Sequence, residues 1–285
     1  MVIQTITLNL IYLYCVQTVI VKQAHIKIET EVTEDTIVDS VMLRGKVIRM
    51  KVKLISHTQH GPYGPGESHP HNIVGVNDAQ ELIAYCARVS NPDNQNNRET
   101  SEKLIKYLIK NKHWSPLEMV NACMEIETTR DIARQILRHR SFSFQEFSQR
   151  YADPIKDLYN SVETKDARFQ DTTNRQNSID FDPNDEPQRR LNENFRMKQM
   201  SVWREAAKTY KWAVENGIAK EQARAVLPEG MTVSRLYMNG TLRSWVHYIE
   251  LRSANGTQKE HREIAVACAQ EIAKVFPLIT DINNV

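Results

Sequence analysis

The stretch RHRSFSFQEFSQR spans residues 138–150 and holds three arginines and one histidine. Arg130 and Arg134 lie just upstream, whereas the formal net charge of the whole chain is only +2. The positive charge is therefore concentrated locally. A guanidinium group binds planar oxyanions through two parallel hydrogen bonds, so the cluster indicates a site for a phosphate-bearing ligand.

The stretch lies at an expected junction between a helix and a strand. Residues 131–137 carry apolar side chains at helical spacing, which places Arg134 and Arg138 one turn apart on one side. From Phe142 to Phe144, apolar and polar side chains alternate as in a strand. A solvated helix face is the ordinary interpretation of such a charged run, but a junction between elements favours a cleft.

The motif Arg-His-Arg, followed by seven residues and Ser148, resembles the signature of the flavin-dependent thymidylate synthases. Gln135 and Glu146, which accompany that signature, are also present. The resemblance extends from about Lys51 to Phe276. Three other blocks of the family occur in the same order: Arg88-Val-Ser90, His113-x-x-Pro-x-Glu118, and Arg224-x-Val-Leu-Pro228 followed by residues 241–252.

The resemblance implies an α+β fold, with helices packed around a small mixed or antiparallel sheet. It implies a methyltransferase of dTMP biosynthesis, which reductively methylates dUMP to dTMP. The implied cofactor is FAD, which supplies the hydride; methylenetetrahydrofolate is the carbon donor and NADPH the reductant. No enzyme nucleophile is expected, and the implied assembly is a homotetramer with flavin at the subunit junctions.

The resemblance also implies which residues bind the substrate. Arg252 stands where the family places the arginine that favours ionisation of the uracil N3, and it is the expected catalytic residue. The expected phosphate and ribose partners are Arg138, Arg150 and Arg224. The positions that match the family's dUMP site are Gln135, Arg138, Glu146, Ser148, Gln149, Arg150, Arg224 and Arg252.

A second set of positions matches the family's flavin site, and no metal ligands are expected. At two of these positions, Thr241 and His247, some members have Asn. In the dUMP site, Gln149 stands where other members have a small residue, so only its backbone is expected to make a contact. The positions that match the flavin site are Ser90, His113, Arg138, His139, Arg140, Glu146, Thr241, Arg243 and His247.

Residues 241–253 predict a helix with two functional faces. Arg243 and His247 are four positions apart and share a face, whereas Arg252 lies about half a turn around the helix axis. One helix could therefore offer a cation and an imidazole to one ligand and a guanidinium to another. On the residues alone, an ordinary charged surface helix explains the pattern equally well.

A nucleic-acid or nucleotide-binding module with a degenerate flavin site is the alternative function. Phe142, Phe144 and Phe147 flank the arginines and could stack on bases. Two of these phenylalanines share one strand face, however, which favours the core. A pI near 8.3 is also too mild to indicate non-specific binding to nucleic acid.

Composition favours a globular protein in a reducing, cytoplasmic setting. The hydrophobic content is 41% and the charged content 25%. The four cysteines are far apart and form no CxxC pair, so neither a zinc site nor a disulfide framework is indicated. Three of them, Cys86, Cys123 and Cys268, are expected to be small core residues, because no base lies nearby in sequence to activate them.

Residues 50–285 are expected to form a single catalytic domain, with residues 1–49 as a dispensable extension. The rival interpretation of residues 1–49 is a β-rich arm that packs on a partner subunit. The apolar run 8–21 is shorter than the ~20 residues that a membrane span needs. Residues 57–71 are rich in Gly, Pro and His and predict a flexible loop without metal-ligand spacing.

The polar residues 157–187 form an insertion longer than the family's usual loop, and they predict a mobile segment or lid. Around it, hydrophobic periodicity predicts both helices and strands. The expected strands follow Met50 and cover 119–128 and 231–238, and the expected helices cover 78–89, 100–111, 191–216, 221–227, 241–253 and 260–276.

Overall fold

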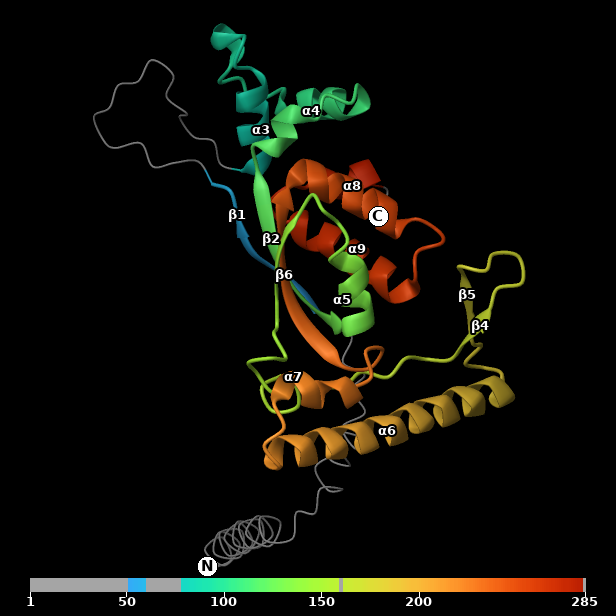
Figure 1. Ribbon diagram of the computed structural model, residues 1–285. Helices are drawn as coiled ribbons and strands as arrows, with labels where there is room; N and C mark the ends of the chain where they lie inside the picture. The colour runs from blue at the N-terminus through green and yellow to red at the C-terminus, as the bar shows by residue number, and fades with distance from the viewer. Residues whose placement is uncertain (1–50, 60–77, 159–160, 284–285) are drawn as a thin grey trace, which may run out of the picture. The chain divides into compact units, whose positions relative to one another are not determined.

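The computed structural model describes residues 51–59, 78–158 and 161–283 (Figure 1). They belong to one compact unit of the chain, Ile48–Val285. The expected extension 1–49 and most of the Gly-, Pro- and His-rich loop lie outside the described residues. No helix in the described ranges is long and apolar enough to cross a membrane.

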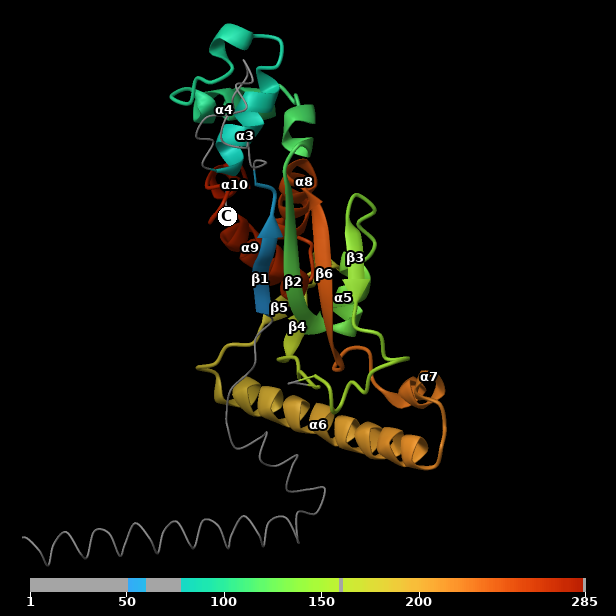
Figure 2. The same cartoon turned by 90° about the vertical axis from the view of Figure 1, so that its left-hand side faces the viewer.

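A four-stranded antiparallel sheet forms the centre of this unit, with strand order β1-β2-β6-β3 (Figure 2). The two central strands pair along their full length, from Asn121 opposite Thr241 to Thr129 opposite Val233. The strands are β1 Lys51–His57, β2 Asn121–Thr129, β3 Ser143–Glu146 and β6 Val233–Thr241.

The sheet buries one face, because apolar side chains alternate along the two central strands. Met124 and Ile126 pair with Met238 and Leu236 on the inner side, and all four side chains are fully buried. The opposite side of the same strands is polar and holds the ion pair between Arg235 and Glu127. The predicted alternation of strand 119–128 is therefore confirmed.

Helices α5, α8 and α9 cover the buried face (Figure 1). Trp245 of α8 is the largest fully buried side chain, and its indole N–H donates to the carbonyl of Ala122 at 3.0 Å. These helices are α5 Arg130–Ile136, α8 Leu242–Ser253 and α9 Lys259–Ile272, and α10 Leu278–Asn283 packs against α8 and α9.

Two helices, α3 Ala79–Ala87 and α4 Ser101–Lys110, precede β2, and the 3₁₀ turn η2 Ser115–Glu118 leads into it. Asp78 caps α3 by accepting a hydrogen bond from the Glu81 amide, as its sequence position predicts. Helical spacing from Leu82 and Cys86 predicts that Val89 also faces the core, but this prediction is wrong, because α3 ends at Ala87 and the Val89 side chain is 69% exposed. A further 3₁₀ turn covers Pro92–Asn94.

The polar insertion contains a short hairpin, β4 Arg168–Gln170 with β5 Ser178–Asp180, and is followed by the long helix α6 Glu186–Glu215 (Figure 1). This helix starts before residue 191 because Asp185 caps it and Pro187 occupies its first turn. The chain then forms α7 Lys220–Ala223 and the 3₁₀ turn η3 Arg224–Val226 before β6. Sheet and helices together confirm the expected α+β class.

Candidate active site

Arg252 and His139 form the centre of the candidate site. The Nε of Arg252, near the end of α8, donates to Nε2 of His139, which follows α5, at 2.9 Å. Gln135, on the last turn of α5, meets His261 of α9: the distance from Gln135 Oε1 to His261 Nδ1 is 3.2 Å. The other His261 nitrogen lies 3.1 Å from the hydroxyl of Tyr248.

The two imidazoles of this cluster are neutral. Burial, and then the positive charge of Arg252, lower the pKa of His139 from 6.5 to about 4. Burial likewise lowers the pKa of His261 to about 3, with Arg252 and His139 as further causes. A neutral His139 has an acceptor nitrogen for Arg252, so the guanidinium is held in place while no carboxylate of the described residues compensates its positive charge.

The other face of α8 carries Arg243 and His247, as the helical spacing predicted. Arg243 forms an ion pair with Glu118 of η2, and the ring of His247 lies edge-on to Trp114 with centroids 4.5 Å apart. Thr241 caps α8 by accepting from the Ser244 amide at 3.3 Å. The prediction that Arg252 points away from Arg243 is confirmed by their different partners.

Arg138 and Arg140 are exposed in the segment between α5 and β3. Within the described ranges, neither guanidinium forms an ion pair. Both therefore remain available to an anionic ligand, in contrast to Arg130 and Arg134, which share the carboxylate of Glu229.

Arg150 and Arg224 form a separate group around Glu221. The Nε of Arg150 lies 3.2 Å from the Glu221 carboxylate, and the Nε of Arg224 donates to the Glu221 backbone carbonyl at 3.3 Å. Both Arg150 and Glu221 are half-exposed. No contact in the described residues joins this group to Arg252.

Three further predicted residues lie between Arg140 and Arg150 in sequence, namely Glu146, Ser148 and Gln149. Glu146 accepts a hydrogen bond from Ser234 at 2.9 Å and lies 3.6 Å from the buried guanidinium of Arg130. The Ser148 hydroxyl contacts only the Arg150 amide among its described neighbours. Gln149 is buried, and its side-chain nitrogen has no partner in the described residues.

Ser90 and His113 lie apart from Arg252. Ser90 lines an open hollow of about 450 Å³ at the end of α3. Arg88, in the wall of the hollow, is bound to Asn97 and Thr100. The exposed His113 packs edge-on to Tyr107. One chain therefore brings together Gln135, His139 and Arg252 but leaves the other predicted residues in separate groups.

The phenylalanines beside the arginines belong to the core. Phe142 is buried against Trp245 with ring centroids 4.8 Å apart, and Phe144 is half-buried. These two rings are not available as a stacking platform for bases. In the described ranges, no group of three or more His, Cys, Asp or Glu side chains could hold a metal ion.

The sequence patterns did not identify His261 and Tyr248 as parts of the site. Both are fully buried. His261 contacts Gln135 directly, and Tyr248 contacts it through His261. The available signal was a histidine in the apolar stripe of α9, at helical spacing from Ile264 and Cys268. A polar residue in such a stripe needs a buried hydrogen-bond partner.

Residues 72–278 match the family model described as thymidylate synthase complementing protein. The chain is 49% identical over 207 residues to a probable flavin-dependent thymidylate synthase of Paramecium bursaria Chlorella virus 1, which covers 73% of this chain and 91% of the relative. It is 50% identical over 199 residues to a flavin-dependent thymidylate synthase of Synechocystis sp., which covers 70% and 86%.

The fold is similar to that of PolB, a UMP/dUMP methylase of Streptomyces cacaoi, with a TM-score of 0.64 and 22% identity. The superposition covers 82% of this chain and 93% of PolB. At that identity the likeness concerns the fold alone, whereas the family model and the two relatives match most of the chain in sequence. The chain therefore belongs to the family of flavin-dependent thymidylate synthases.

Proposed function

We propose that this chain binds dUMP and FAD and forms dTMP, with methylenetetrahydrofolate as carbon donor and NADPH as reductant. The observation that carries the proposal is the hydrogen bond from Arg252 to a neutral His139, beside Gln135. A guanidinium fixed without a carboxylate partner in the described residues keeps its full charge for a ligand. Beside the uracil ring, that charge lowers the pKa of N3 and makes the ring more reactive.

The remaining nucleotide contacts follow from the arginines. Arg138, Arg150 and Arg224 are the proposed partners of the phosphate and ribose, because forked cations bind a dianionic phosphate strongly. Gln135, Glu146 and Ser148 supply neutral or acceptor groups for the sugar and base. The buried, unpartnered nitrogen of Gln149 is a further donor, which adds its side chain to the expected backbone contact.

The polar groups around α8 fit a flavin dinucleotide. FAD carries a pyrophosphate, which suits Arg138 and Arg140, two exposed arginines without an ion pair in the described residues. Arg243 and His247 add a cation and an imidazole, and positive charge near the ring stabilises the reduced flavin. When bound and reduced by NADPH, the flavin supplies the hydride for the transferred carbon. The proposed set is completed by Ser90, His113, His139, Glu146 and Thr241.

We propose a homotetramer because the described part of one chain leaves the residues of this site in separate groups. The group of Arg150 and Arg224 makes no contact with Arg252 in the described residues, and Ser90 lines a different hollow. A nucleotide that binds both groups needs either movement within a chain or residues from a second copy. The second explanation places flavin at the subunit junctions. The cytoplasmic location stays a prediction.

The test combines colour, mass and product. Purified protein is expected to show the absorption band of oxidised flavin, one flavin per chain and the solution mass of a tetramer. With dUMP, methylenetetrahydrofolate and NADPH it is expected to release dTMP. A colourless protein that takes up no added FAD, and forms no dTMP, would contradict the proposal and favour the nucleotide-binding module.

A further inference from the structure

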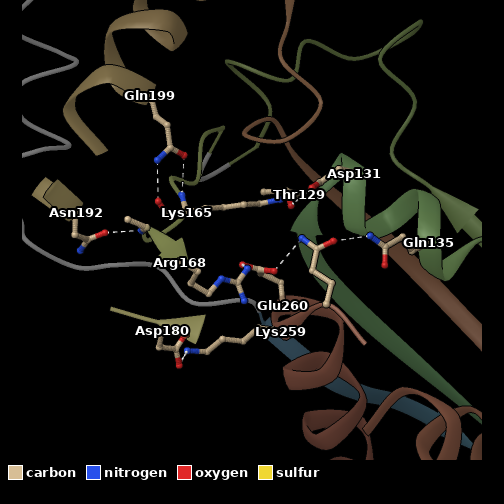
Figure 3. Close-up of polar contacts among 12 residues, drawn as sticks. Thr129, Asp131, Gln135, Lys165, Arg168, Asp180, Asn192, Gln199, Lys259 and Glu260 are labelled. Atoms are coloured by element: carbon tan, nitrogen blue, oxygen red, sulfur yellow. Dashed lines mark hydrogen bonds and ion pairs between the residues drawn. The ribbon is translucent and has the colours of Figure 1, made fainter. Parts of the chain in front are cut away.

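The polar insertion is tied to the start of α9 by two ion pairs (Figure 3). Arg168 of β4 donates from Nη2 to Glu260 Oε1 at 2.5 Å, and both side chains are mostly buried. Asp180 of β5 binds Lys259 at 2.7 Å, and Asp180 is exposed whereas Lys259 is half-buried. The polar composition predicted a mobile segment or lid, but these contacts anchor the hairpin.

From Glu260 a chain of hydrogen bonds leads to the candidate active site. Gln258 Nε2 donates to Glu260 Oε2 at 3.0 Å, and Gln135 Nε2 donates to Gln258 Oε1 at 2.8 Å. Figure 3 shows Arg168 and Glu260 at one end of this path and Gln135 at the other. Beyond Gln135, the path continues through His261 to Tyr248.

The carboxylate at one end sets the direction of every bond in this path. Burial alone would raise the pKa of Glu260, but the hydrogen bond from Arg168 holds it below its ordinary value. An ionised carboxylate only accepts hydrogen bonds, so Gln258 must turn its nitrogen toward Glu260 and its oxygen toward Gln135. Gln135 must then turn its nitrogen toward Gln258.

The same logic fixes the far end of the path. Gln135 Oε1 faces His261 Nδ1, which must carry the proton because an amide oxygen only accepts. The unprotonated Nε2 of His261 then accepts from the Tyr248 hydroxyl. After these bonds, Gln135 has one N–H and one oxygen lone pair left, in fixed positions.

We propose that the buried Arg168–Glu260 pair is a positioning element that fixes the amide orientation of Gln135, and thereby the donor and the acceptor that Gln135 offers to the nucleotide. The inference rests on the proposed role of Gln135 in binding dUMP. It gives the insertion a role in substrate recognition within the same chain. Arg168 and Glu260 act through Gln258 and touch no substrate themselves.

The first test replaces the carboxylate by an amide. Glu260→Gln can donate as well as accept, so it no longer dictates the orientation of Gln258 and Gln135. In the FAD-loaded enzyme, we expect the dissociation constant for dUMP, measured by calorimetry, to rise about tenfold, on the scale of one hydrogen bond. Arg168→Lys keeps the cation beside Glu260 and is expected to bind dUMP nearly as the unaltered enzyme does.

Asp180→Asn is the matched control. It removes the neighbouring anchor of the same hairpin but leaves the path to Gln135 intact, so dUMP affinity is expected to stay within about twofold of the unaltered enzyme. Equal losses of affinity in Glu260→Gln and Asp180→Asn would mean that dUMP affinity depends only on the anchoring of the hairpin and not on the path to Gln135. That result would overturn the inference.

A double-mutant cycle separates positioning from a general structural effect. If Glu260 acts through Gln135, Glu260→Gln should weaken dUMP binding no further in a Gln135→Ala background. Additive losses would overturn the inference while leaving the proposed function in place. Failure of the unaltered, flavin-loaded enzyme to bind dUMP would instead overturn the proposed function, and the inference with it.

Discussion

The guanidinium of Arg252 is held by the imidazole of His139 through a hydrogen bond of 2.9 Å between their two Nε atoms. The two residues lie on different elements, one near the end of α8 and one just after α5. Tyr248 supports the contact, because its ring packs edge-on to His139 with centroids 4.9 Å apart. The orientation of Arg252 is therefore set by the protein before a ligand binds.

We predict that Arg252→Ala abolishes dTMP formation but leaves flavin bound. Loss of one fixed charge at the reacting group costs about 10²–10³-fold in rate. The measurements are turnover with saturating dUMP and the flavin absorption of the purified variant. Arg134→Ala is the control, since Arg134 binds Glu229 on the surface, and it should retain turnover. Normal dTMP formation by Arg252→Ala would rule out the proposed N3 role.

The two neutral histidines predict that stability falls as the solution becomes acidic. Their folded pKa values, about 4 for His139 and about 3 for His261, lie below the ordinary 6.5. Protonation therefore favours the unfolded chain, so the stabilisation is complete above pH 6.5 and is lost as the pH falls toward 4. The loss is up to about 1.4 kcal/mol per pH unit for each proton taken up.

Urea unfolding between pH 7.5 and 4.5 measures this loss. His261→Gln removes one of the two titrating groups and should give a shallower dependence on pH. Burial raises the pKa of Glu163 to about 7, which acts in the opposite direction over this range, so the test is the difference between the unaltered protein and His261→Gln. The same pH dependence in both proteins would show that the imidazole of His261 is not buried as described.

The cysteines provide a test of the mechanism without an enzyme nucleophile. Burial raises the pKa of the thiols of Cys86, Cys123 and Cys268 above the ordinary value, which makes all three poor nucleophiles. Cys86→Ala and Cys123→Ala are expected to form dTMP at a rate within about twofold of the unaltered enzyme. A variant that binds flavin and dUMP normally but forms no dTMP would identify its cysteine as a nucleophile.

Local periodicity was enough to predict most of the fold. The alternation of β2 and the two faces of α8 follow from side-chain spacing alone, so the separation of Arg243 from Arg252 could be foreseen. Val89 could not be placed, because the end of a helix depends on backbone groups that periodicity does not report.

The support of the active site could not be predicted in the same way. His261 and Gln258 meet Gln135 only after α5 and α9 pack together, and no local spacing joins residues so far apart in sequence. The insertion presents the same problem, since its polar composition is typical of a mobile loop. Its buried ion pair depends on a partner, Glu260, that lies 92 positions from Arg168.

Removal of residues 1–49 tests the expected domain boundary. The family model matches residues 72–278 and leaves the first residues unmatched. A chain that starts at Met50 is expected to keep flavin content, solution mass and dTMP formation. Loss of flavin or of the assembly in the shortened chain would support the rival interpretation, in which these residues pack on a partner subunit.

Gly240 is predicted to be intolerant of any side chain, because Phe142 packs directly against its backbone. A Cβ at this position would overlap the Phe142 ring, with Cε1 at 2.6 Å. The ring has little room to move, since it is buried between Trp245 and Tyr248 at centroid distances of 4.8 and 5.8 Å. We expect Gly240→Ala to lower the free energy of unfolding by about 1–3 kcal/mol, the range for overpacked cores.

Chemical denaturation compares this variant with Gly230→Ala. A Cβ at Gly230 meets its nearest neighbour, Asp131, only at 4.0 Å, so this control should change stability by less than about 0.5 kcal/mol. Phe142 follows His139 by three positions, so displacement of its ring should also shift His139 and weaken its hydrogen bond with Arg252. Gly240→Ala is therefore expected to lose turnover along with stability, and equal stability of the two variants would contradict the packing described for Phe142.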